Sequence, residues 1–178
     1  MIFEEAGLEG AYIIEPDRLE DERGFFARVY CKEEFEAHGL NSDFTQCSIS
    51  FNERKGTLRG MHYQVVPHQE AKLVRCTMGA IYDVILDLRS SSPTFEKWQA
   101  VVLTADNRKM LYVPEGCAHG FQTLEANSEV HYQMSVAYQA EAASGIKFND
   151  PAFGIVWPIC DEMILSNKDL SFENYIGR

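Results

Sequence analysis

Residues 72–88 read Lys-Leu-Val-Arg-Cys-Thr-Met-Gly-Ala-Ile-Tyr-Asp-Val-Ile-Leu-Asp-Leu. Two runs rich in apolar and β-branched residues, 72–78 and 80–88, lie on either side of the single Gly79. Such runs are typical of strands, and glycine adopts the positive φ of a tight turn without steric cost. The stretch therefore predicts two strands separated by a very short turn.

The rest of the chain repeats this pattern. Further short runs with β-branched or aromatic content are found at 25–30, 44–51, 58–64, 99–103, 109–113, 119–124, 129–136 and 145–148. Turn residues separate them at a spacing of roughly 8–12 residues. One short helix is expected at 32–38, where Gly39 ends it. Evenly spaced short strands predict an all-β sandwich or barrel, with a jelly roll as the strongest candidate.

Length and composition indicate one globular domain spanning residues 1–178, with 165–178 as a polar C-terminal tail. The 178 residues are 46% hydrophobic and 24% charged, and no low-complexity linker divides them. No apolar run approaches the roughly 20 residues of a membrane span, and the first residues lack the features of a signal peptide. The five cysteines form no Cys-x-x-Cys pair, which favours reduced thiols. We therefore expect a cytoplasmic protein.

The net charge of −11 argues against nucleic acid or an anionic membrane as a partner. An anionic ligand would need a local basic cluster, and residues 58–72 contain one in Arg59, His62, His68 and Lys72. A guanidinium, an imidazole and an ammonium group suit an anionic ligand that undergoes proton transfer. On spacing alone, a strand with scattered polar residues explains the stretch equally well.

Residues 129–134 alternate so that Val130, Tyr132 and Met134 share one face of a strand. A buried tyrosine needs a partner for its hydroxyl. Tyr132 is thus either a hydrogen-bonded core residue or an acid that lines a cavity.

The segment Pro114-Glu115-Gly116-Cys117-Ala118-His119 resembles the second motif of the cupins, in which the histidine binds a metal. The first cupin motif would fall at residues 62–64, where Gln64 replaces the second histidine. A three-histidine metal site made by His62, His68 and His119 is an alternative.

Taken together, several segments resemble the dTDP-4-dehydrorhamnose 3,5-epimerase family over about residues 10–170. In order along the chain they are Asp21-Glu22-Arg23-Gly24-Phe25-Phe26, Leu58-Arg59-Gly60-Met61-His62-Tyr63-Gln64, Lys72-Leu73-Val74-Arg75, Asp83-Val84-Ile85-Leu86-Asp87-Leu88-Arg89, Ser92-Pro93-Thr94-Phe95, Pro114-Glu115-Gly116, Ala118-His119-Gly120-Phe121, Leu165-Ser166 and Lys168-Asp169. The resemblance implies a cupin-type jelly-roll β-barrel with a few short helices. It also implies a homodimer, no metal or other cofactor, and a nucleotide-sugar substrate.

By the same resemblance, His62 is the catalytic base, Asp169 orients its imidazole and Tyr132 is the proton donor. Further contacts would follow the substrate from sugar to base: Lys72 near the C4 oxygen, His119 in the sugar pocket, Arg23 and Arg59 at the diphosphate, Tyr138 stacked on the base, and Lys168 as a further nucleotide contact. The reaction implied is inversion at C3 and C5 of a 4-keto-6-deoxyhexose through an enolate.

The chain departs from the family pattern mostly at the nucleotide end. Among the expected substrate contacts there, Gln46 is followed by Cys47 and Ser48 where the family has Asp-Asn, and Arg28 replaces a glutamate. The reaction class is therefore better marked than the nucleotide, and a GDP- or CDP-linked sugar is an alternative to thymidine. The sequence is also compatible with a C3-only epimerase, a ketoisomerase, a non-catalytic sugar-nucleotide-binding protein and a metal-dependent cupin oxygenase.

Overall fold

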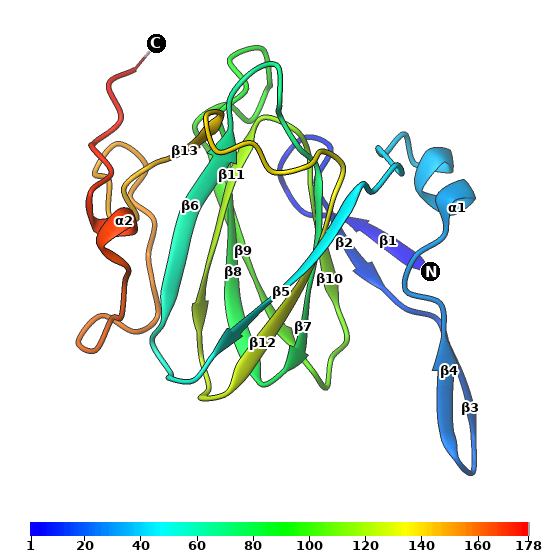
Figure 1. The fold of residues 1–178 in the computed structure, drawn as a ribbon. Coiled ribbons are helices and arrows are strands. Elements are labelled where there is room, and N and C mark those ends of the chain that lie inside the picture. Colours follow the sequence, from blue (N-terminus) through cyan, green and yellow to red (C-terminus); the bar gives the residue numbers. More distant parts are fainter. Residues whose placement is uncertain (178) are drawn as a thin grey trace.

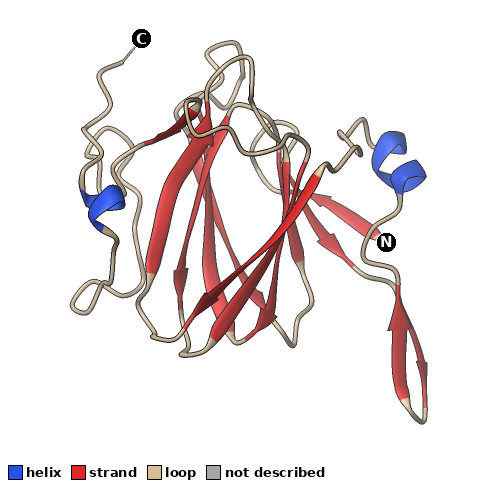
Figure 2. Ribbon diagram, in the orientation of Figure 1, coloured by secondary structure: helices blue, strands red, loops and turns tan. Residues whose placement is uncertain are grey.

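The computed structural model describes residues 1–177 as two antiparallel sheets that face each other (Figures 1 and 2). The six-stranded sheet has the order β1-β2-β10-β7-β12-β5, and the five-stranded sheet has the order β13-β6-β11-β8-β9. A separate pair, β3 and β4, forms a hairpin. The jelly-roll prediction is confirmed, but the sheets form a sandwich and not a closed barrel.

The elements are short. Those of the six-stranded sheet are β1 (Ile2–Glu5), β2 (Tyr12–Glu15), β10 (Met110–Val113), β7 (Lys72–Met78), β12 (Ser128–Met134) and β5 (Gln46–Asn52). Those of the five-stranded sheet are β13 (Ala143–Gly145), β6 (Leu58–Gln64), β11 (Cys117–Thr123), β8 (Ala80–Asp87) and β9 (Trp98–Thr104). The hairpin is β3 (Arg18–Asp21) and β4 (Gly24–Ala27), and the helices are α1 (Lys32–Ala37) and α2 (Asn167–Leu170).

The strands on either side of Gly79 belong to different sheets, so this glycine makes a corner between the two layers. Its φ is +73°, and a Cβ there would lie 2.5 Å from Ser128 Oγ. Strand β8 shows the resulting two-sided burial. Ile81 and Ile85 pack in the core between the sheets, whereas Val84 and Leu86 pack on the outer face.

The segment after β13 covers that outer face. Residues from 146 to 165, among them Phe148 and Trp157, bury it, and α2 follows beside β6 (Figure 1). The segment expected as a polar tail thus contains a helix, which begins after the cap Ser166. The sequence prediction also missed β1, β2 and β3, each four residues long, and it placed a strand at 145–148 where β13 ends at Gly145. None of these three strands alternates strictly between apolar and polar residues, so none shows the usual strand pattern.

No helix within residues 1–177 is long and apolar enough to cross a membrane.

Candidate active site

His62 on β6 and Asp169 on α2 form a close pair, with Nε2 of the imidazole 2.5 Å from Asp169 Oδ1. The second carboxylate oxygen accepts a hydrogen bond of 2.8 Å from Ser166 Oγ. Burial of Asp169 opposes its ionisation, but the hydrogen bonds from His62 and Ser166 outweigh burial and lower the pKa of the carboxyl. Asp169 is thus an ionised acceptor that fixes one nitrogen of a partly exposed imidazole.

His119 on β11 lies opposite His62 in the antiparallel pairing of β6 with β11. The two strands approach closely because Gly60 and Gly120 meet: a Cβ on Gly60 would lie 2.5 Å from Gly120 Cα. A side chain at either position would clash with the facing strand. The imidazole of His119 is buried, and its Nε2 lies 2.8 Å from Asp83 Oδ1.

The ring of Tyr132 meets the ring of His119 edge to face, with 6.1 Å between centroids. Burial raises the pKa of the Tyr132 hydroxyl, and the charge of Asp83 adds to this effect while that of Arg59 opposes it. The phenol therefore stays protonated near neutral pH and is able to donate a proton. The sequence left two interpretations of Tyr132 open, a core residue and an acid that lines a cavity. The structure supports part of each, because Tyr132 lies beside polar and titratable groups and also packs against the core between the sheets.

Two cations border this region. Arg59 donates from Nε to Asn52 Oδ1 at 2.8 Å. This hydrogen bond fixes the guanidinium group at Nε and leaves its other two nitrogens for a ligand. Lys72 is 8% exposed and shares the inward face of β7 with Val74, which lies opposite Tyr132. Its Nζ lies 3.0 Å from Glu70 Oε1. A substrate with negative charge could therefore be held here despite the acidic composition of the whole chain.

Gln46, Ser48, Tyr138 and Lys168, expected at the nucleotide, lie on β5, on the segment after β12 and on α2. Gln46 and Ser48 alternate with exposed neighbours on β5, and Ser48 lies opposite Tyr132. Gln46 Oε1 accepts from the backbone N–H of Tyr138 at 2.9 Å. The Tyr138 side chain is 56% exposed, and Lys168 lies next to Asp169 on α2 with an exposed side chain.

Arg23 and Arg28 are not brought to this region within one chain. Both lie on or beside the β3–β4 hairpin, which projects from the body on the opposite side from α2 (Figure 1). Arg23 pairs with Asp21 at 2.5 Å, and Arg28 pairs with Glu34 at 3.2 Å. His68 lies in the loop after β6, where its carbonyl accepts from Gln64 Nε2.

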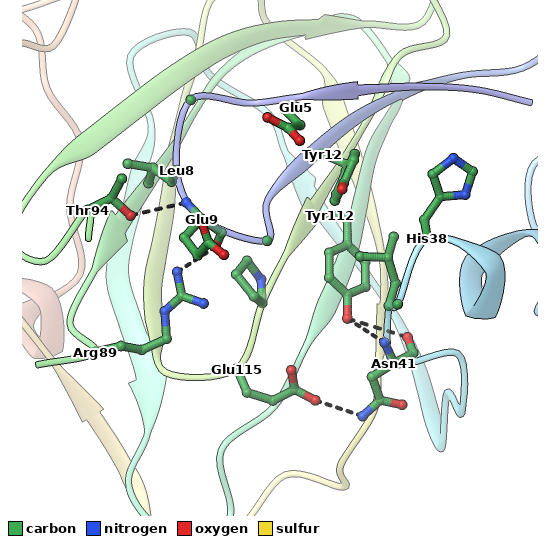
Figure 3. Close-up of a pocket in the computed structure, with 15 residues that line it drawn as sticks. Glu5, Leu8, Glu9, Tyr12, His38, Asn41, Arg89, Thr94, Tyr112 and Glu115 are labelled. Atoms are coloured by element: carbon green, nitrogen blue, oxygen red, sulfur yellow. Dashed lines mark hydrogen bonds between the residues drawn. The ribbon is translucent and has the colours of Figure 1, made fainter. Parts of the chain in front are cut away.

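The cavity in Figure 3 is a different place. It has a volume of about 520 Å³ and is lined by residues from 5–12 and 38–41 together with Arg89 and Glu115. Several of its polar groups are already paired: Arg89 donates to the carbonyl of Glu9 at 2.6 Å, and Asn41 donates to Glu115 at 2.7 Å. The cavity includes none of the residues predicted for the site.

Sequence reasoning missed the groups that hold the predicted residues, namely Asp83, Glu70, Asn52 and Ser166. Asp83 carried a signal, because a carboxylate between Ile81 and Ile85 on the inward face of an apolar strand needs a buried partner. Within residues 1–177, no group of three or more His, Cys, Asp or Glu side chains is arranged to hold a metal ion. Cys76 and Cys117 are buried, whereas Cys47 and Cys160 are exposed.

The jelly-roll sandwich is the fold of the cupin-type epimerases. A family model described as dTDP-4-dehydrorhamnose 3,5-epimerase matches residues 5–175, and the chain belongs to this family. The dTDP-4-dehydrorhamnose 3,5-epimerase of Sinorhizobium fredii is 39% identical over 171 residues, which are 96% of this chain and 88% of the relative.

Two solved structures bear on the ligand. The Bacillus anthracis dTDP-4-dehydrorhamnose 3,5-epimerase, with TDP and PPi bound, aligns with a TM-score of 0.93 and 40% identity, covering 98% of this chain and 99% of that one. A 3'-monoepimerase from Streptomyces bikiniensis, in complex with dTDP-quinovose, aligns with a TM-score of 0.87 and 31% identity, covering 96% and 86%.

Proposed function

We propose that this protein inverts C3 and C5 of a dTDP-linked 4-keto-6-deoxyhexose, converting dTDP-4-dehydro-6-deoxyglucose to dTDP-4-dehydrorhamnose for deoxysugar synthesis. The observation that carries the proposal is the pairing of His62 with Asp169, on a strand whose neighbour carries His119 packed edge to face against Tyr132. Membership of the epimerase family supports the same substrate class.

His62 is the base in this mechanism. The hydrogens on C3 and C5 flank the C4 ketone, so removal of either proton leaves its electron pair in an enolate with negative charge on the C4 oxygen. Asp169 holds one ring nitrogen of His62, which leaves the other for the proton and stabilises the imidazolium that forms. Tyr132 then delivers a proton to the opposite face of the same carbon, and inversion results.

The ammonium of Lys72 stabilises the charge that develops. Lys72 would face the C4 oxygen and His119 would line the sugar pocket. Both side chains are buried, and fixed donors act more strongly where water is scarce. Arg59 would bind the diphosphate, since its planar fork matches phosphate oxygens. Gln46, Ser48, Tyr138 and Lys168 would contact the nucleotide.

The test is to incubate the protein with dTDP-4-keto-6-deoxyglucose in D2O and to follow the C3 and C5 protons by NMR. Exchange at both carbons with formation of the inverted sugar is expected. If no 4-keto sugar nucleotide, whether dTDP-, GDP- or CDP-linked, exchanges a proton, the protein is not an epimerase. Faster turnover of a GDP- or CDP-linked sugar would reassign the nucleotide.

A C3-only epimerase is the second candidate function, because the chain also resembles a 3'-monoepimerase along most of its length. Both activities need the same base and acid, so the same residues serve either. The NMR experiment separates them, since a C3-only enzyme leaves the C5 proton unexchanged.

We further propose that the enzyme is a homodimer in which the β3–β4 hairpin reaches the partner. Leu19 and Phe26 on the hairpin are 67% and 72% exposed, and Ile49 on the outer face of the edge strand β5 is 64% exposed. Apolar side chains at these positions favour burial against another surface. Arg23 and Arg28 would then act at the partner's nucleotide site.

The absence of Cys-x-x-Cys pairs supports the cytoplasmic location also proposed.

A further inference from the structure

Lys72 is held by a carboxylate that no part of the proposed mechanism uses. Its Nζ lies 3.0 Å from Glu70 Oε1, and the two side chains are 11% and 10% exposed. The other carboxylate oxygen, Oε2, accepts a hydrogen bond of 2.8 Å from Gln64 Nε2. Both oxygens of Glu70 are therefore engaged, and the carboxylate has little freedom to rotate.

Gln64 is itself fixed at both ends of its amide. It is 3% exposed; Nε2 also donates to the His68 carbonyl at 3.1 Å, and Oε1 accepts from the backbone N–H of Gln139 at 2.7 Å. Gln139 directly follows Tyr138, whose own N–H is bonded to Gln46. One chain of hydrogen bonds thus runs from the segment expected at the nucleotide to the ammonium expected at the sugar.

A nearly buried ion pair of this kind is weak evidence for stability, because removing two charges from water costs about as much as their attraction returns. The pair instead gives Lys72 a defined position before any ligand arrives. An ammonium on four methylenes has many rotamers, and ordering it costs conformational entropy. If the Lys72 side chain is already ordered in the free enzyme, no further entropy is lost in ordering it when the enolate forms.

We propose that Glu70, anchored by Gln64, is a positioning residue that orients Lys72 toward the C4 oxygen and links its position to the segment carrying Tyr138. This inference rests on the proposed epimerase function. Gln64 occupies the place where metal cupins carry a second histidine, and in this chain its amide holds a carboxylate. Glu70 itself does not touch the substrate.

The experiment compares the wild-type protein with Glu70→Gln and Glu70→Asp. Glutamine keeps the shape and can still accept from Gln64 through its amide oxygen, but it no longer attracts the ammonium. We expect kcat for inversion and the rate of deuterium wash-in at both carbons to fall about 10- to 100-fold, the cost of a misplaced catalytic group. Binding of dTDP, which has no sugar ketone, should change by less than about twofold, since Arg59 and the nucleotide contacts are retained. Glu70→Asp keeps the charge and should recover part of kcat.

Glu15→Gln is the matched control, because it removes a lysine–glutamate pair of 2.7 Å to Lys109 at the surface of the six-stranded sheet. It should leave kcat and dTDP binding unchanged. A Glu70→Gln protein with wild-type kcat would overturn the inference. A loss of dTDP affinity as large as the loss of kcat would also overturn it, because equal losses indicate general damage to the site. If Glu70→Gln does not fold, the Glu70→Asp protein decides by the same two measurements. If the wild-type protein exchanges no proton at C3 or C5, the proposed function is wrong, and the inference that rests on it is wrong too.

Discussion

His62 and His119 lie opposite each other on neighbouring strands, and each imidazole is bonded through Nε2 to a carboxylate from another element. The carboxylate of His62 comes from α2, after the chain has wrapped the outer face of the five-stranded sheet. That of His119 comes from β8, the neighbouring strand within the same sheet. One imidazole is partly exposed and the other is buried. This difference fits a base that receives a substrate proton and a second group that lines the pocket.

Replacing His62 by asparagine should abolish exchange at both C3 and C5, because His62 is the base that removes both protons in the proposed mechanism. Asp169→Asn should lower kcat by about 100-fold or more, since the amide no longer stabilises an imidazolium. Both variants should still bind dTDP. NMR exchange rates together with a dTDP titration provide the check, and normal exchange by His62→Asn would mean that the base is another residue.

Tyr132→Phe should reduce net inversion more than deuterium wash-in. The base can still remove and return a proton on one face, whereas delivery to the opposite face needs the phenol. We expect inversion to fall by about 100- to 10,000-fold, the usual range for loss of a general acid. Equal loss of inversion and wash-in would argue that Tyr132 acts on enolate formation and not on proton delivery.

Asp87 should make stability depend on acid pH. Burial opposes its ionisation, but hydrogen bonds from Arg89, Ser92 and Thr94 outweigh burial and lower the pKa of Asp87 to about 2. Because the folded-state pKa lies below the unfolded value of about 3.9, the stabilisation is complete above that pH and is lost as the pH falls toward 2. The contribution is about 2 kcal/mol at neutral pH.

Urea unfolding from pH 7 to pH 2.5 tests this dependence. The difference in unfolding free energy between the wild type and Asp87→Asn should shrink as the pH falls. Asp161→Asn, at an exposed position, should follow the wild type at every pH. A difference that does not vary with pH would show that Asp87 contributes through packing alone.

Gly60→Ala should destabilise the fold and impair catalysis together. Gly60 has a φ of +139°, and the added Cβ would meet the backbone of Gly120 at 2.5 Å, two residues before His62. We expect a loss of more than about 1–3 kcal/mol, the cost of backbone strain alone. Gly154→Ala is the control, because Gly154 has a φ of +61° but no atom within 4 Å of the added Cβ. It should lose stability by strain only and keep full kcat, whereas equal kcat in both variants would contradict the packing role of Gly60.

Phe26→Glu should convert the proposed dimer to a monomer, because a charge at a buried interface position is costly. The molar mass from light scattering measures this directly. Val156→Glu serves as the control, since Val156 is 66% exposed but lies on the C-terminal segment and not on the hairpin. A wild-type protein that is monomeric at micromolar concentration would rule out the dimer, and with it the role of Arg23 at a partner site.

The sequence by itself determined the all-β class, because strand alternation and turn residues are local properties of each short segment. It indicated a jelly roll as the strongest candidate within that class. It also marked His62, Tyr132 and Asp169 through their family context. Only the tertiary structure decided which groups hold them. Asp169 is 107 residues from His62 along the chain, and a hydrogen bond over that distance depends on how the C-terminal segment packs. The tertiary structure also decided that Glu70 lies beside Lys72, because side-chain direction and burial set that pair. It likewise decided the position of Arg23, because the protruding hairpin holds this residue away from the active site of its own chain.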